Sequence, residues 1–225
     1  MKDLAPALTV LLVLLVLLSA WRALPVLAVL LFPDRLRVSF EDPLSIEAAL
    51  SGPPQTREWL RRLREMGFLV MGVKVERLPL WGRAVREVAL VSKESAAYAS
   101  VVLHPDGSPA NLYFHTPLRD GGMVFTSNSS TGIRSARDGA NIQHLPVADL
   151  TQVLAAHRER VQALQSAGAV PQVGHTPDAR LQATRAFYRQ HLRQNAVPLI
   201  VRQGALTFVL SLVLLGLVVA WWRLR

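Results

Sequence analysis

Long apolar segments without charge occupy both ends of the chain. Residues 205–222 contain no charged side chain and lead into arginines, and residues 4–20 show the same pattern before a tryptophan and an arginine. A helix rises about 1.5 Å per residue, so about 20 residues cross the hydrocarbon core of a bilayer. Tryptophan and arginine at the end of such a helix are typical of the membrane interface. The pattern predicts transmembrane helices in residues 1–22 and 198–225.

The segment after the first apolar run is harder to assign. Leu24–Phe32 is apolar again, but it is too short to span a bilayer, and Pro25 lies near its start. We expect residues 23–37 to form an interfacial segment along the head groups, or a bend within one long helix. A cleaved signal peptide is the alternative, because Lys2 precedes the apolar core. The length of that core and the presence of Asp3 favour a retained anchor.

Two helices are predicted before residue 68. Ser45–Leu50 is helical until the breaker at residues 51–54, and a second helix continues to Gly67, with Thr56 as its expected N-cap. Its apolar residues recur with helical spacing, and its arginines take the opposite face. The apolar set is Trp59, Leu60, Leu63 and Met66.

From residue 68 the pattern changes to a period of two, which indicates strands. Val73 and Val75 alternate with Lys74 and Glu76, and short turns rich in glycine, proline and aspartate separate successive apolar runs. Short connections predict an antiparallel meander. The five predicted strands are residues 68–78, 85–92, 97–104, 110–116 and 123–127.

The last third of the middle region is mainly helical. A short strand is expected around Ile142, followed by a helix over residues 149–167 and by a linker. Thr176, Pro177 and Asp178 are typical of a helix start, so another helix is predicted to about residue 195.

Together these elements predict an α+β fold. We expect an antiparallel β-meander of about five strands with helices on one face, flanked by N-terminal and C-terminal transmembrane helices. Residues 38–168 are the expected soluble domain, and residues 169–197 the linker and a basic juxtamembrane helix.

Composition narrows the class of protein. The chain has 25 basic and 16 acidic residues, a net charge of +9 and no cysteine. The absence of cysteine excludes disulfides and thiolate metal sites. The basic residues form no run with interleaved aromatics, so no nucleic acid partner is expected. Arginines near the predicted spans lie mostly on the domain side, which favours a cytoplasmic domain, although Lys2 before an apolar core is also typical of an anchor with its N-terminus inside.

Two residues are candidates for catalysis. His115 in the fourth strand and Asp120 in the next turn could form a histidine–carboxylate pair, but no nucleophile motif accompanies them. A hydrogen-bonded histidine in the sheet is the alternative for His115. His157 lies on the apolar stripe of its helix and is expected to be buried. The spacing of these histidines and His144 matches no metal site, so neither metal nor cofactor is expected.

The segment 128–141 is long for a connection and offers an anion site. Arg134 and Arg137 supply cations, and Gly132 and Gly139 allow tight backbone turns. A flexible surface loop would have the same composition.

Basic residues also gather before the second apolar run. Arginines beside a bilayer attract anionic head groups at about 1 kcal/mol each. A connecting helix that packs its apolar side on the domain is the alternative. The residues expected at the membrane surface are Arg185, Arg189, Arg193 and Arg202.

Three functions are compatible with these features. The first is a bacterial inner-membrane accessory or sensory module, which binds an unknown ligand or a membrane protein partner and does no catalysis. The second is a membrane-bound hydrolase or transferase that acts on a lipid or phosphorylated substrate through His115 and Asp120 together with the segment 128–141. Transport is disfavoured, because the two predicted spans carry no polar path unless the chain oligomerises.

Overall fold

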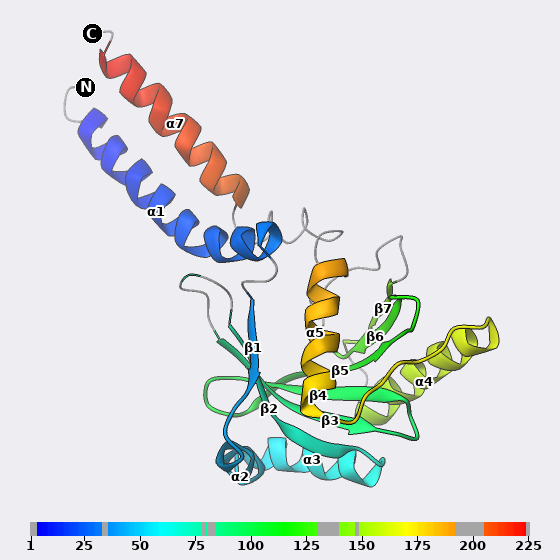
Figure 1. Cartoon of the computed structure of the whole chain (residues 1–225). Helices are drawn as coiled ribbons and strands as arrows, with labels where there is room; N and C mark the ends of the chain where they lie inside the picture. Colours follow the sequence, from blue (N-terminus) through cyan, green and yellow to red (C-terminus); the bar gives the residue numbers. More distant parts are fainter. Residues whose placement is uncertain are drawn as a thin grey trace. The chain divides into compact units, whose positions relative to one another are not determined.

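The computed structural model describes residues 4–32, 36–77, 80, 84–129, 140–146, 149–191 and 205–223. The chain divides into two compact units. One comprises residues 37–77 and 84–194, and the other comprises residues 1–36, 78–83 and 195–225. Figure 1 shows the first unit as a sheet with helices and the second as mainly helical.

The first unit contains one seven-stranded sheet whose strands follow the chain order. Strands β1 to β6 pair antiparallel, whereas β7 pairs parallel to β6. The strands are β1 Arg37–Phe40, β2 Leu69–Arg77, β3 Ala84–Ser92, β4 Ala97–Leu103, β5 Pro109–Pro117, β6 Met123–Ser127 and β7 Ala140–His144.

The α+β class and the meander are confirmed, and so is the short strand around Ile142. The sheet has two more strands than the five of the predicted meander, because β7 joins its edge and the four-residue β1 was not predicted. The parallel pairing of β7 also explains the length of the connection after β6, since parallel strands cannot be joined by a tight turn.

Helices α2, Leu44–Leu50, and α3, Pro54–Glu65, confirm the predicted pair. Thr56 is not the N-cap. Pro53 occupies that position, because a proline at the next residue already has the φ angle of a helix start. The hydroxyl of Thr56 instead donates to the carbonyl of Gly107, at 2.8 Å.

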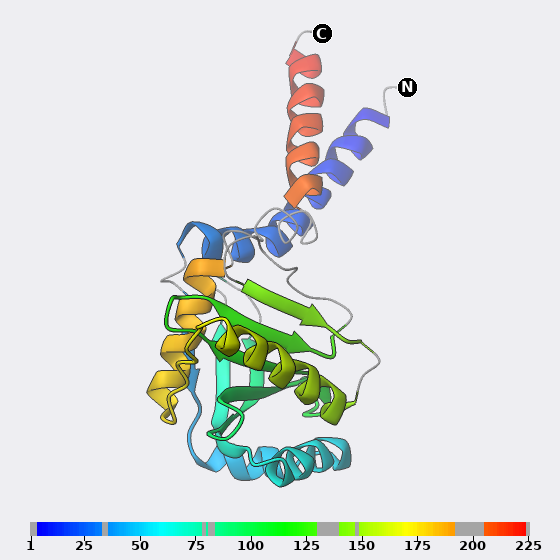
Figure 2. The ribbon, with the colours of Figure 1, turned by 90° about the vertical axis from the view of Figure 1, so that its right-hand side faces the viewer.

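One face of the sheet is apolar and is covered by α3 and by α4, Leu150–Ser166 (Figures 1 and 2). Asp149 caps α4 in a capping box with Gln152. The buried side chains on this face include Leu60, Leu63, Phe68, Val88, Leu90, Leu112, Phe114, Val153 and Leu154. This apolar layer is the main core of the domain.

The prediction that helices cover one face only is wrong. Helix α5, Pro177–His191, packs on the opposite face, where Arg180 and Thr184 contact side chains of β2 and β3. Lys74 alternates with valines along β2 and therefore points to this second face. It is fully buried, since α5 covers it.

The second unit contains α1, Leu4–Leu31, and α7, Ala205–Arg223, which lie side by side (Figure 1). Helix α1 includes Pro25 and changes direction along its length (Figure 1). Many of its described side chains are exposed leucines or valines, and the same holds for α7.

No helix within the described ranges was found to have the length and the apolar character needed to cross a bilayer. The two predicted transmembrane helices are therefore not confirmed.

Candidate functional site

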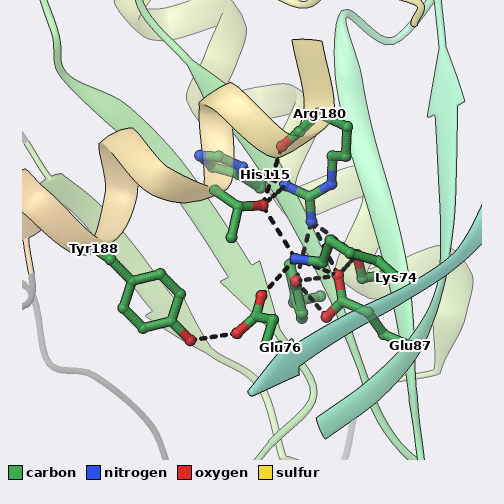
Figure 3. Close-up of polar contacts among 9 residues, drawn as sticks. Lys74, Glu76, Glu87, His115, Arg180 and Tyr188 are labelled. Carbon is green, nitrogen blue, oxygen red and sulfur yellow. Dashed lines mark hydrogen bonds and ion pairs between the residues drawn. The ribbon is translucent and has the colours of Figure 1, made fainter. Parts of the chain in front are cut away.

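The face of the sheet under α5 carries a buried charge cluster (Figure 3). Two cations and two carboxylates form its centre: Lys74 and Glu76 from β2, Glu87 from β3 and Arg180 from α5. Their partners are Ser100, Tyr113, His115, Thr184 and Tyr188.

Alternation along the strands places these groups together. Lys74 and Glu76 are two residues apart, so both point to the same face of β2, and Lys74 lies directly opposite Glu87 in the register. Ser100 lies opposite Tyr113 in the next pair of strands. The α5 residues are spaced at i, i+4 and i+8, which places them on one side of the helix: Arg180, Thr184 and Tyr188.

Lys74 is held by three partners. Its ammonium group lies 2.7 Å from Glu87 Oε1, forms a second ion pair with Glu76, and donates to Thr184 Oγ1 at 3.0 Å. An ammonium group has three hydrogens to donate, so all of them have acceptors. Lys74 therefore has no hydrogen left to donate to a ligand.

Glu87 is the central acceptor of the cluster. Besides Lys74, it accepts from Ser100 at 2.9 Å and from the Tyr113 hydroxyl at 2.7 Å, and Arg180 Nη2 lies 3.3 Å away. Glu76, at the edge of the cluster, accepts from the hydroxyl of Tyr188.

Arg180 is 1% exposed and extends from α5 into the cluster. Its guanidinium carbon lies 4.9 Å from the ring centroid of Tyr98, and Nη1 is 3.3 Å from His115 Nδ1. The Nε atom of Arg180 is buried and has no hydrogen-bond partner among the described residues.

The charge states follow from this arrangement. Burial alone would lower the pKa of Lys74, but the carboxylates of Glu76 and Glu87 outweigh burial and raise it above its ordinary value. Burial would raise the pKa of Glu87, yet Lys74 and Arg180 lower it. Burial and Glu87 raise the pKa of Tyr113 to about 12. At neutral pH Lys74 and Arg180 are therefore cations, Glu87 is an anion and Tyr113 is neutral.

Two cavities open beside α5. The first, called the Lys74 cavity, has a volume of about 400 Å³ and is bordered by the charge cluster together with Val85, Val102, Phe125 and Phe187. The second, called the Tyr98 cavity, has a volume of about 340 Å³ and lies near the β5–β6 turn. His115 and Phe187 border both cavities.

The predicted pair of His115 and Asp120 has a different arrangement from that expected. His115 is buried beside Arg180 and Tyr98, whereas Asp120 is exposed and accepts from the backbone N–H of Gly122 within its own turn. His115 belongs to the charge cluster, and Asp120 stabilises a turn.

The histidines do not form a metal centre among the described residues. His157 is fully buried on the other face of the sheet, with ring nitrogens 2.9 Å from Thr116 Oγ1 and 3.1 Å from Thr126 Oγ1. Burial lowers its pKa to about 3, so it is neutral. The prediction of a buried histidine is confirmed. His144 borders the Lys74 cavity.

The other predicted binding residues are only partly described. Arg134, Arg137, Gly132 and Gly139 lie outside the described residues, and so do Arg193 and Arg202.

Arg185 and Arg189 are exposed on α5. Arg185 donates to the carbonyl of Val38 at 3.4 Å. The helix therefore contacts the domain, and both arginines remain exposed.

Sequence reasoning missed the charge cluster. The strand and helix patterns place Lys74, Glu87, Tyr113 and Arg180 in their elements but do not indicate that these side chains meet. The available signal was the polar stripe at residues 180, 184 and 188, opposite strands that also carry polar residues every second position.

Comparison of the chain with family models, curated proteins and solved structures finds no match.

Proposed function

We propose that the chain is a membrane-anchored binding module without catalytic activity, and that the Lys74 cavity is its ligand site. The observation that carries this proposal is a cavity of about 400 Å³ beside a charge cluster whose members already pair with one another. Cavities of this size accept small molecules, and the hydrogen bonds and ion pairs of the charge cluster give this cavity a rigid wall.

The same cluster favours binding over the alternative of a membrane-bound hydrolase or transferase. A general base at neutral pH needs a pKa near 7. Glu76 and Glu87 raise the pKa of Lys74, and burial raises that of Tyr113 to about 12. Neither group gives up its proton near neutral pH, so neither is prepared to activate a nucleophile.

Membrane anchoring is proposed from the uncovered apolar side chains of the helical unit. Leu11, Leu17 and Leu217 are each at least 60% exposed, on helices that carry many similar residues. Each fully exposed leucine costs about 1.5–3 kcal/mol relative to burial, and a lipid environment would remove that cost. We therefore propose that α1 and α7 insert into the inner membrane of a bacterium and that the domain is cytoplasmic.

Two further partners are part of this proposal. The exposed Arg185 and Arg189 would meet anionic lipid head groups, and a membrane protein would respond to the occupied cavity.

The binding role can be tested in a host strain that lacks the chain and shows a growth defect. Val85 borders the cavity and is 41% exposed, so Val85→Trp should fill the cavity without disturbing the core. We expect Val85→Trp to fail to restore growth, whereas Asp120→Ala and the exposed control Leu69→Trp restore it. If Val85→Trp restores growth and Asp120→Ala does not, the result would instead support the alternative of a membrane-bound hydrolase or transferase.

Anchoring is tested by washing membranes with alkaline carbonate. The full chain should remain in the membrane pellet, and its complete release into the supernatant would contradict insertion. Reporter fusions at both termini should be active only outside the cytoplasm. Activity of a C-terminal reporter in the cytoplasm would contradict the proposed orientation.

A further inference from the structure

The apolar part of the Lys74 cavity is mainly aromatic. Tyr113 and Phe125 stack with ring centroids 4.9 Å apart at 23°, and Phe125 and Phe187 stack at 6.2 Å and 15°. All three side chains are half-buried and border the cavity. A wall made of three aromatic side chains favours an aromatic ligand, because each edge-to-face or offset aromatic pair contributes about 0.5–1.5 kcal/mol beyond apolar burial.

The charges in the wall leave no place for a ligand ion. The positive charges of Lys74 and Arg180 are balanced by the carboxylates of Glu76 and Glu87, with which they form ion pairs inside the cluster. A charged ligand would lose its hydration in the cavity, and no unpaired opposite charge of the cluster would compensate it. The wall therefore favours a ligand without net charge.

We infer that the Lys74 cavity binds an uncharged, flat aromatic molecule. This molecule packs against the side chains of Tyr113, Phe125 and Phe187. This inference rests on the proposed function, which assigns the cavity as the ligand site.

Three naphthalene probes of nearly equal size test the inference. They are 2-naphthamide, which is neutral, 2-naphthoate, which is an anion, and 2-naphthylmethylammonium, which is a cation. Binding is measured by the change in probe fluorescence with the full chain in phosphatidylcholine nanodiscs, against empty nanodiscs as the blank. Val85→Trp fills the cavity, Val102→Trp fills it from the neighbouring strand, and Leu69→Trp is the control, because Leu69 is 73% exposed and does not border the cavity.

We expect 2-naphthamide to bind at least tenfold more tightly than either charged probe, and expect both filling variants, but not the control, to abolish its binding. Tighter binding of a charged probe that is also lost in the filling variants would overturn the neutral ligand and leave the cavity as the binding site. If no probe binds in a way that the filling variants abolish, this inference is wrong. The growth test above then decides separately whether the cavity has a role. Circular dichroism of each variant establishes that it is folded.

Discussion

Removing Arg180 should destabilise the domain by far more than removing a surface arginine. Arg180 and Glu87 are 1% and 2% exposed at the side chain, with 3.3 Å between Nη2 and Oε1. Loss of one partner from a buried ion pair costs about 3–5 kcal/mol, because the other charge stays buried. We expect Arg180→Met to lower the free energy of unfolding by that amount, and Arg185→Met, on the exposed side of the same helix, by about 0.5 kcal/mol or less.

A double-mutant cycle separates the ion pair from the packing of the side chain. Glu87→Gln alone leaves two cations with one carboxylate, whereas Glu87→Gln with Arg180→Met restores the balance of charge. The double variant should therefore be about 1–3 kcal/mol more stable than the sum of the single effects predicts. The cycle of Lys74→Met with Glu87→Gln should give a larger coupling, because Lys74 Nζ lies only 2.7 Å from Glu87 Oε1.

The assay is urea unfolding of the full chain in detergent, followed by near-ultraviolet circular dichroism of the domain. The midpoint and the slope give the free energy of unfolding, and an unchanged slope shows that the same surface unfolds. Effects that add within about 0.5 kcal/mol would refute coupling across the cluster.

Two further predictions concern the rest of the domain. His157 has a pKa of about 3 when folded, against 6.5 as the ordinary value, so only the unfolded chain takes up this proton between those pH values. The free energy of unfolding should therefore fall by about 1.4 kcal/mol per pH unit below about pH 6, and His157→Gln should remove that part of the slope; equal slopes would contradict a neutral buried histidine. Gly72 has a φ of 152°, and a Cβ there would lie 2.8 Å from the ring of Phe40, whereas Gly168 has a φ of 93° and open space. Gly72→Ala should destabilise the domain more than Gly168→Ala by about 1–3 kcal/mol in the same urea assay, and equal costs would show that Phe40 moves aside freely.

Much of the fold could be predicted, because local patterns determine it. Alternation of apolar and polar residues predicted five strands, and the helical spacing of the apolar residues 59, 60, 63 and 66 predicted α3. The short strand β1 was not predicted, because four residues show too little alternation to distinguish a strand from a polar linker. Its strand conformation depends on pairing with β2, which is distant in the sequence.

The charge cluster could not be predicted in the same way. Arginine at position 180 fits a solvated helix face as well as a buried one, and the difference depends on which sheet face α5 covers. Lys74 and Arg180 are separated by more than a hundred residues, so no local spacing connects them. The polar stripe on α5 was visible, but its partner strands were not.

The protonation of Lys74 tests the central claim, that the cluster is a closed wall of a binding site and not a catalytic centre. The chain has only three lysines, Lys2, Lys74 and Lys93, so their side-chain signals can be separated by NMR of lysine labelled with ¹³C at Cε. We expect the Lys74 signal to stay unchanged from pH 6 to pH 10, because Glu76 and Glu87 raise its pKa. Titration of Lys74 between pH 7 and pH 9 would contradict the claim and would identify a lysine able to act as a base or nucleophile.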